Sequence, residues 1–135
     1  GDVYKRQILV SGMQIISEEH RWEKWADYPK TRACLLREIA ETQTPTILLS
    51  GDRHIHEISV LQDWAGKFPL PDITSSGLTH SWDGFPGETN RHRVGEVFTG
   101  LGYGMINIDW SGPKPQIKLA IKDTNGNTQI SHQIE

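Results

Sequence analysis

The sequence has a single cysteine, Cys34, no excess of positive charge and no long hydrophobic run. One cysteine excludes an internal disulfide framework and a cysteine-rich zinc site. Lysine and arginine number 14 against 17 aspartates and glutamates, which gives a net charge of −3. General nucleic-acid binders and proteins that lie on anionic membranes need a basic excess, so no nucleic-acid-binding surface is expected. No apolar stretch of about 18 residues is present, so no membrane span is expected either.

The length of 135 residues suits one small domain with a real core. Residues 1–7 are charged and aperiodic, and they run abruptly into the apolar Ile8–Val10. We interpret residues 1–7 as a non-native remnant, similar to translated adapter sequence, and the alternative is a flexible native arm. On this interpretation residues 8–135 are the domain portion and the natural N-terminus is missing. The cellular compartment is therefore unknown from the sequence.

The hydrophobic pattern predicts a mixed α/β (α+β) fold. A short strand is expected within 8–13 and a helix over 30–41, while the apolar segment 46–50 is typical of a strand buried on both faces. Segment 54–61 fits a strand or a helix, 62–70 a loop, 73–76 a short strand and 81–101 a long irregular excursion. Alternating residues at 104–110, 116–122 and 128–134 predict an antiparallel β-meander, with a hairpin turn at Asn125-Gly126.

Polar residues follow the apolar strand directly. Asp52 and His54 are two positions apart, so on an extended backbone their side chains would project together as oxygen and nitrogen donors for a metal. The alternative is structural, with Asp52 capping the turn and His54 a hydrogen-bonded, partly buried histidine. His54 and His56 also form a His-x-His pair, but neither metallo-β-lactamase nor cupin spacing follows it. We therefore expect His56 beside the site or at the surface, not as a ligand.

The segment Ser50-Gly51-Asp52-Arg53-His54 resembles the Gly-Asp-x-His motif of alkaline phosphatase D-like metallophosphatases. This family belongs to the calcineurin-like metallophosphoesterase class, whose last motif is commonly Gly-His-x-His. Four further segments, in the same order, resemble the surroundings of that motif: 11–16, 23–32, 74–81 and 103–110. The resemblance covers almost the whole chain from Ile8 onward.

The resemblance implies the C-terminal half of a four-layer α/β/β/α sandwich, ending in the β-meander. Asp52 and His54 would be ligands of a cluster of divalent or trivalent metal ions, such as iron, calcium, zinc or manganese. Metal-activated water would attack a small-molecule phosphate ester. The upstream ligand motifs of the family are absent, so the expected partner is the missing N-terminal half of the same domain, and the fragment is expected to be inactive alone. Many members of the family are exported, which would permit a periplasmic location.

Other residues are weaker candidates, each with a structural alternative. Arg53 and His80 are candidates for catalysis or for binding substrate phosphate, against an Arg53 pair with a carboxylate such as Glu57 and a surface or capping role for His80. The cluster 90–93 fits phosphate contact or a solvated loop, and Trp82 and Phe85 fit a pocket wall or a loop anchor. Segment 18–20 is expected on an exposed loop.

The rival function is a non-enzymatic β-rich binding module in which Asp52 and His54 only stabilise a turn. Truncation also predicts an unpaired apolar sheet face or edge that tends to associate.

Overall fold

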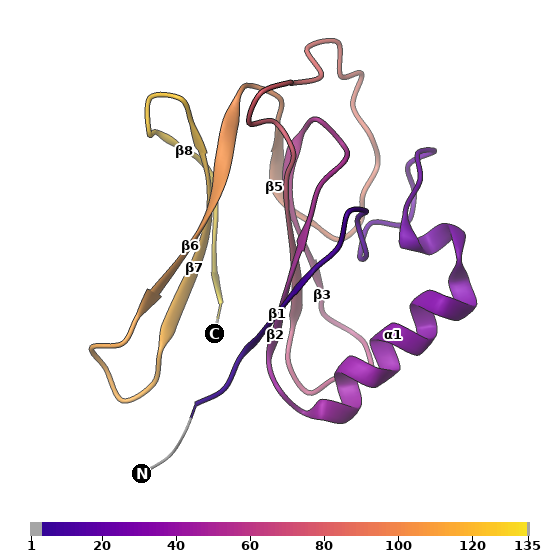
Figure 1. Cartoon of the computed structure of the whole chain (residues 1–135), viewed down its shortest axis with the longest axis vertical. Helices are drawn as coiled ribbons and strands as arrows, with labels where there is room; N and C mark the ends of the chain where they lie inside the picture. The colour runs from indigo at the N-terminus through magenta and orange to yellow at the C-terminus, as the bar shows by residue number, and fades with distance from the viewer. Residues whose placement is uncertain (1–3, 135) are drawn as a thin grey trace.

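The computed structural model describes residues 4–134, which form one α-helix and two β-sheets (Figure 1). The larger sheet has the order β1-β2-β4-β3-β5 and the smaller one β6-β7-β8. Their strands are β1 Gln7–Val10, β2 Thr46–Ser50, β3 His56–Leu61, β4 Leu70–Ser75, β5 Arg93–Phe98, β6 Gly102–Asp109, β7 Gln116–Asp123 and β8 Thr128–Ile134. The helix α1 spans Pro29–Thr42, preceded by a 3-10 turn, η1, at Trp25–Asp27. The α+β class is confirmed. No helix among the described residues has the length and apolar character needed to cross a membrane.

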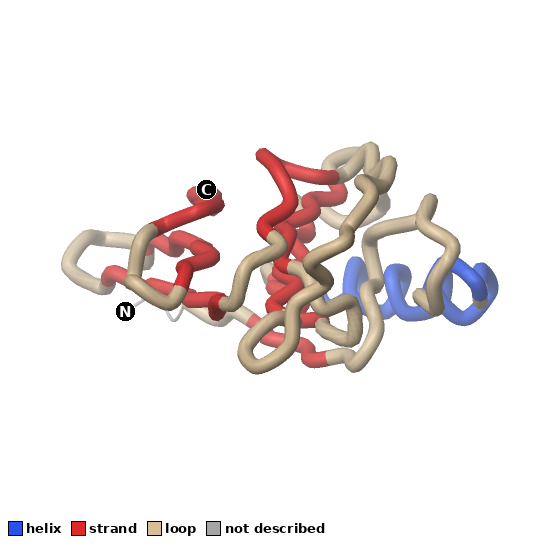
Figure 2. The backbone as a smooth tube through the Cα atoms, turned by 90° about the horizontal axis from the view of Figure 1, so that it is seen from above, coloured by secondary structure: helices blue, strands red, loops and turns tan. Residues whose placement is uncertain are grey.

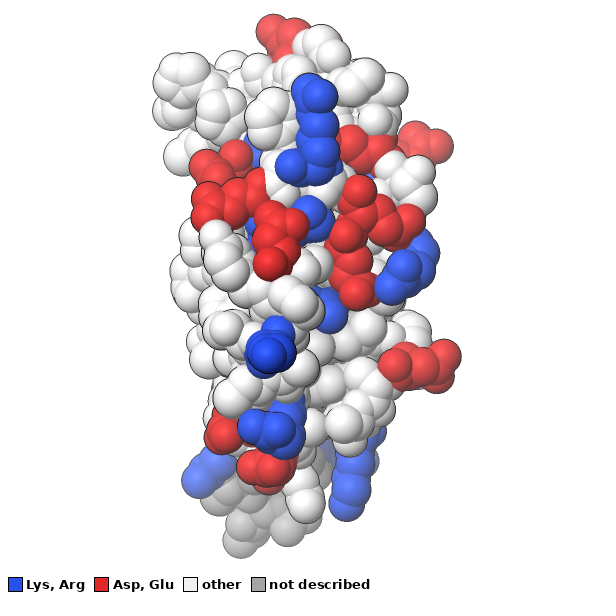
Figure 3. All heavy atoms as spheres, turned by 90° about the vertical axis from the view of Figure 1, so that its right-hand side faces the viewer, with Lys and Arg blue, Asp and Glu red and all other residues white. Residues whose placement is uncertain are grey.

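The helix, the larger sheet and the smaller sheet form three successive layers (Figures 1 and 2). Helix α1 begins at Pro29, because an amide hydrogen at the first helical position would have no partner within the helix. It ends at Thr42, and the next residue, Gln43, caps it in the left-handed conformation. Its buried residue Ile39 packs on the larger sheet in one apolar cluster. A second cluster fills the space between the two sheets. Acidic and basic side chains are interspersed on the face that carries α1 (Figure 3).

Strand β2 lies between these two cores. Ile47 packs between the sheets, and its neighbour Leu48 packs toward α1. Because successive side chains in a strand point to opposite faces, a strand covered on both sides must be apolar throughout. The central residues 47–49 meet this requirement, and the prediction of 46–50 as a strand buried on both faces is confirmed.

The predicted meander is also confirmed. Strand β7 pairs antiparallel with both β6 and β8, and its inward residues Ile117, Leu119 and Ile121 are buried. The hairpin between β7 and β8 turns at Gly126, whose φ of 80° is costly for other residues. The Asp123 carboxylate accepts the amides of Asn125 and Asn127, each at 2.9 Å, which fixes the turn.

Two sequence predictions need correction. The segment 81–101 is not irregular throughout, because it contains β5, which pairs antiparallel with β3 through a register shift between His56 and Ile58. Gly95 in β5 has a φ of 71°, and such a residue interrupts the alternation that marks a strand. Segment 54–61, left open between strand and helix, contains the strand β3. The predicted strand at 73–76 begins earlier, at Leu70.

Strand β1 is an open sheet edge. Its amides at Gln7 and Ser11 donate to β2 and the residue before it, so the intervening amides of Ile8 and Val10 point away from the sheet. Ile8 is 47% exposed and Val10 78% exposed. A groove of about 860 Å³ runs from Ile8 to Trp110, which is 66% exposed. Of the residues assigned to a remnant, 1–3 lie outside the described residues, whereas Gln7 is part of β1.

Substituting Val10 by lysine is expected to reduce self-association of the chain. Within the described part of the chain, the outer edge of β1 carries amides without a partner strand beside exposed apolar side chains. This combination favours edge-to-edge pairing, and a charge on an edge strand opposes it. Sedimentation velocity over a range of protein concentrations measures the shift from oligomer to monomer. Leu78→Lys is the matched control, because Leu78 is 73% exposed but lies in a loop and is not part of β1. Equal effects of the two substitutions would contradict an association through β1.

Candidate functional site

The carboxyl ends of three parallel strands lie at one edge of the larger sheet. Strand β2 pairs parallel with β1 and with β4, so the segments that follow all three strands leave the sheet in the same direction. Ligand sites in α/β sheets gather at such an edge. The three segments meet around a hollow of about 460 Å³, here called the site hollow, which is lined by Arg21, Trp22, Glu23, Asp52, Arg53, His54 and Trp82.

The segment after β2 turns sharply instead of continuing as an extended chain. Asp52 has a φ of 68° and His54 a φ of 54°, both left-handed. Aspartate and histidine are among the residues that tolerate this region best. The extended backbone assumed from the sequence is therefore wrong at this point. Asp52 and His54 are nevertheless both exposed and both line the site hollow, while Arg53 between them is buried.

Two backbone hydrogen bonds hold His54 in place. The His54 amide donates to the Ser76 hydroxyl at 3.0 Å, and its carbonyl accepts the Trp82 amide at 2.8 Å. His80 lies beside it, with the two imidazole centres 6.2 Å apart. His80 is exposed, and its Nδ1 lies 2.9 Å from the Thr79 hydroxyl. The fold thus brings the candidate His80 next to His54 but outside the residues that line the site hollow.

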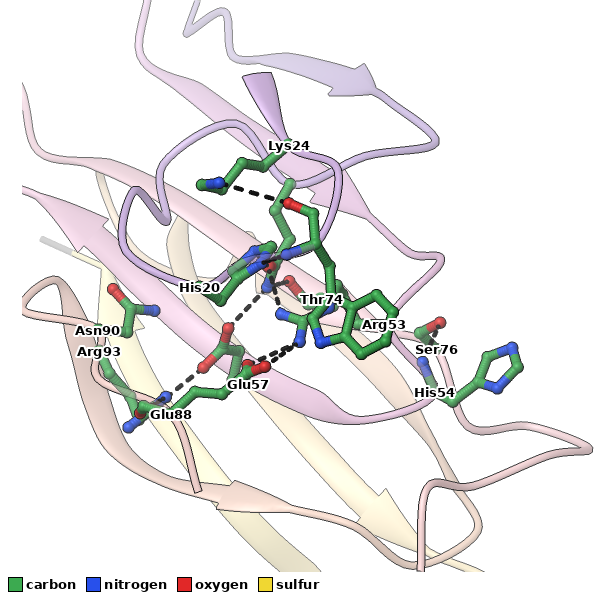
Figure 4. A network of polar contacts seen from close by, with 12 residues as sticks. His20, Lys24, Arg53, His54, Glu57, Thr74, Ser76, Glu88, Asn90 and Arg93 are labelled. Atoms are coloured by element: carbon green, nitrogen blue, oxygen red, sulfur yellow. Dashed lines mark hydrogen bonds and ion pairs between the residues drawn. The ribbon is translucent and has the colours of Figure 1, made fainter. Parts of the chain in front are cut away.

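Arg53 turns away from His54 and into the protein (Figure 4). Its guanidinium donates to both carboxylate oxygens of Glu88, at 2.6 and 2.7 Å, and to Gln14 Oε1 at 3.1 Å. The predicted alternative of an ion pair is correct in kind, but the partner is Glu88 and not Glu57. Because a carboxylate and an amide oxygen already take its donors, Arg53 has little capacity left for a substrate phosphate.

A buried polar network supports the loop from behind (Figure 4). Gln14 Nε2 donates to Glu57 at 2.6 Å and to Thr74 at 2.8 Å, and the other Glu57 oxygen accepts Arg93 Nε at 2.9 Å. Glu57 is 1% exposed, so its charge is balanced within the protein by Arg93. Buried polar groups need such partners, and a satisfied network fixes one geometry.

Asp72 is a second buried carboxylate, placed on β4 beneath the same loops. Its Oδ1 accepts the Ser50 hydroxyl at 2.7 Å, and its Oδ2 accepts the amides of Ile15 at 2.9 Å and Ile16 at 3.3 Å. Burial raises the pKa of Asp72 to about 6, against the lowering effect of these hydrogen bonds. Asp72 therefore ties the segment after β1 to the ends of β2 and β4.

The cluster 90–93 is not a solvated loop, and its donors are largely engaged. Arg91 and His92 both contact Glu18 at 2.7 Å, and the amide nitrogen of Asn90 donates to Ser59 at 2.9 Å. The two contacts with Glu18 clamp the 76–92 segment to the segment after β1, and the Arg93–Glu57 pair joins β5 to β3. Phosphate contact by this cluster would require these pairs to break.

Two histidines have surroundings that the sequence did not predict. His56 is fully buried, with its ring stacked on Phe98 at 5.7 Å, so it is neither at the surface nor in the site hollow. Burial lowers the pKa of His56. His20, expected on an exposed loop, is 5% exposed, and its Nε2 lies 2.9 Å from Gln14 Oε1. Its position joins the segment after β1 to the buried network.

An aromatic wall borders the site hollow. Trp22 and Trp82 meet edge to face with centres 5.8 Å apart, and Phe85 packs on Trp82 at 5.2 Å. The Arg21 guanidinium lies 4.9 Å from the Trp22 ring centre. Phe85 therefore anchors the loop, as one of the two sequence interpretations held, and Trp82 also lines the hollow. Trp22 and Arg21 were not identified from the sequence, because nothing local links residue 22 to residue 82.

The described residues contain no group of three or more His, Cys, Asp or Glu side chains placed to hold one metal ion. Asp52 and His54 supply two exposed donors at one hollow, and structural and catalytic zinc sites alike use at least three protein ligands. Any metal held here needs donors from beyond this set. No protein-family model matches the chain, and no curated protein matches it significantly.

Proposed function

We propose that this chain is part of a metal-dependent phosphoric-ester hydrolase, with Asp52 and His54 as two of the metal ligands. The observation that carries the proposal is their joint exposure at one hollow beyond the carboxyl ends of β1, β2 and β4. The similarity of segment 50–54 to the Gly-Asp-x-His motif is the basis for proposing the hydrolysis of a phosphate ester. A bound metal ion would activate water and neutralise charge on the phosphate.

The residues of this chain fit part of such a site. Asp52 offers a carboxylate and His54 an imidazole, which suit a divalent or trivalent ion, and the buried Asp72 and Glu57 hold the supporting loops. On this proposal the remaining donors come from a preceding half of a four-layer sandwich. The two-donor set of the isolated chain is expected to bind metal weakly and to hydrolyse no phosphate ester.

Titration with Mn²⁺ tests the ligand assignment on the chain itself. Mn²⁺ is paramagnetic, so it broadens the NMR signals of a histidine that binds it or lies near it. The His54 imidazole signals should broaden first and those of His80 next, since the two rings are 6.2 Å apart. His132 on β8 serves as the internal reference.

Asp52→Asn should raise the Mn²⁺ concentration needed for this broadening by about tenfold or more, since even residues that support a metal ligand cost that much when removed. Asp83→Asn is the matched control, because Asp83 is an exposed carboxylate outside the site hollow. Equal broadening in both variants, or broadening of His132 as strong as that of His54, would reject the metal site.

A non-enzymatic binding module is the second candidate function. The observation that favours it is the conformation of the loop: Asp52 and His54 occupy left-handed backbone positions, and His54 is fixed by Ser76 and Trp82 through its backbone. This backbone conformation and these hydrogen bonds are sufficient for a structural turn, without a ligand role for either side chain. A chain that fails the Mn²⁺ test while keeping its fold supports this candidate.

A further inference from the structure

The wall of the site hollow combines two tryptophans with Arg21, a cation that makes no ion pair within the described residues 4–134. Trp22 is 44% exposed, and it reaches the hollow from the segment after β1, whereas Trp82 reaches it from the segment after β4. Neither ring is part of the two apolar cores. Large aromatic side chains left at the surface beside polar donors are typical of ligand pockets.

Both rings are held in position although they are outside the cores. The Trp22 amide donates to His20 Nδ1 at 3.1 Å, and the Trp82 amide donates to the His54 carbonyl at 2.8 Å. The rings meet at an interplanar angle of 88°, so they form a corner, and Phe85 packs edge to face on Trp82 at 78°. The same two rings also line a neighbouring hollow of about 420 Å³ and thus separate it from the site hollow. An aromatic corner whose rings already contact each other can bind a planar ring with little reorganisation.

Arg21 is the available cation at this place. Its guanidinium lies over the Trp22 ring and, within residues 4–134, makes no ion pair, in contrast to Arg53, which donates to Glu88 and Gln14. An arginine held over a tryptophan keeps its hydrogen-bond donors free for an anion.

We propose that Trp22 and Trp82 form a subsite for the planar aromatic group of a phosphate ester, with Arg21 beside them as a donor to its phosphate. This inference rests on the proposed function and specifies its substrate class: an ester whose leaving group carries an aromatic ring, bound on the tryptophans, with its phosphate directed toward Asp52 and His54. The volume of about 460 Å³ accommodates a ligand of that size.

Binding of simple probes to the full chain tests the subsite without any metal. Phenyl phosphate, phenol and glycerol 3-phosphate are titrated in buffer with chelator, and the indole N–H signals of the five tryptophans are followed by NMR. Phenyl phosphate should shift the signals of Trp22 and Trp82, and glycerol 3-phosphate at the same concentration should leave them in place. Arg21→Gln should weaken phenyl phosphate binding and leave phenol binding unchanged.

Trp22→Ala should weaken phenyl phosphate binding by about tenfold, the size of a typical ring-stacking contribution. Trp110→Ala is the matched control, since Trp110 is also exposed but lies in the distant groove beside β1. The signals of the packed Trp25 and Trp64 report whether each variant is folded. Trp82→Leu provides a second test if Trp22→Ala does not fold.

The outcomes test the aromatic subsite and the metallohydrolase separately. Equal binding of phenyl and glycerol phosphates, or equal loss in Trp22→Ala and Trp110→Ala, overturns the aromatic subsite even if Mn²⁺ binds at His54. Ring-dependent binding in a chain on which Mn²⁺ does not bind at His54 supports the subsite and rejects the metallohydrolase.

Discussion

Replacing Arg53 by methionine is expected to lower the free energy of unfolding by about 3–5 kcal/mol, the usual cost of breaking a buried ion pair. The Arg53 side chain is 3% exposed and that of Glu88 is 12% exposed, and the two are joined by two short hydrogen bonds. Methionine fills similar volume but leaves the Glu88 carboxylate and the Gln14 oxygen without this donor. Urea denaturation at neutral pH measures the loss.

Two further variants separate the ion pair from simple loss of packing. Arg91→Met is the matched control, because Arg91 also pairs with a glutamate but its side chain is 61% exposed, so we expect less than about 1 kcal/mol. Adding Glu88→Leu to Arg53→Met should recover much of the stability, since an apolar pair replaces a stranded charge. A cost for Arg53→Met no greater than that for Arg91→Met, or no recovery in the double variant, would contradict a buried charge pair.

The ion pair also explains why the role of Arg53 could be predicted only in part from the sequence. In the sequence Arg53 stands between two candidate ligands, and Glu57 is the nearest carboxylate downstream. The actual partner, Glu88, is 35 residues away in a segment without a clear periodic pattern. Only the folding of the 76–92 segment over the larger sheet brings the two together.

Elements with a strong local pattern could be predicted from the sequence. Pro29 and the apolar stripe defined α1, the uniform apolar run defined β2, and alternation with Asn125-Gly126 defined the meander. Each of these patterns lies within one continuous segment, so the spacing of its apolar residues indicates by itself which side of the element is buried. Strand β5 has Gly95 in its middle and a register shift in its pairing, so its alternation is lost.

The site was predicted in part for the same reason. Asp52 and His54 could be identified because a buried strand ends immediately before them. Their left-handed backbone could not, since the sequence shows no glycine at either position. Trp22, Arg21 and His20 were missed because their contacts join separate loops, and the charged residues around them suggested an exposed surface. Only the tertiary structure identifies such residues.

His20 and Asp72 are expected to give the folding stability two opposing dependences on pH. The neutral His20 ring suits its surroundings, because Nδ1 accepts the Trp22 amide and Nε2 then carries the hydrogen that is donated to Gln14. Burial, with Arg53 nearby as the next cause, lowers the pKa of His20 from 6.5 to about 4. The pKa of Asp72 is raised by burial from 3.8 to about 6.

The sign of each effect follows from which state holds more protons. Between about pH 4 and 6.5 the unfolded chain carries a proton on His20 that the folded chain lacks, so stability rises with pH. Between about pH 4 and 6 the folded chain carries a proton on Asp72 that the unfolded chain lacks, so stability falls as pH rises. At about 1.4 kcal/mol per pH unit, the effect of His20 amounts to at most about 3.5 kcal/mol and that of Asp72 to at most about 3 kcal/mol, and in the native protein the two largely cancel.

Single substitutions should therefore reveal pH dependences of the free energy of unfolding that cancel in the native protein. Asp72→Asn keeps an oxygen for the Ile15 and Ile16 amides and removes the charge, so its free energy of unfolding should drop steeply from pH 6.5 to pH 4.5. His20→Asn keeps an acceptor for the Trp22 amide, and its stability relative to the native protein should instead improve over the same change. Urea unfolding at pH 4.5, 5.5 and 6.5 measures both, and the remaining acids titrate alike in all three proteins. Parallel pH profiles for the native protein and both variants would show that neither group titrates as its burial requires.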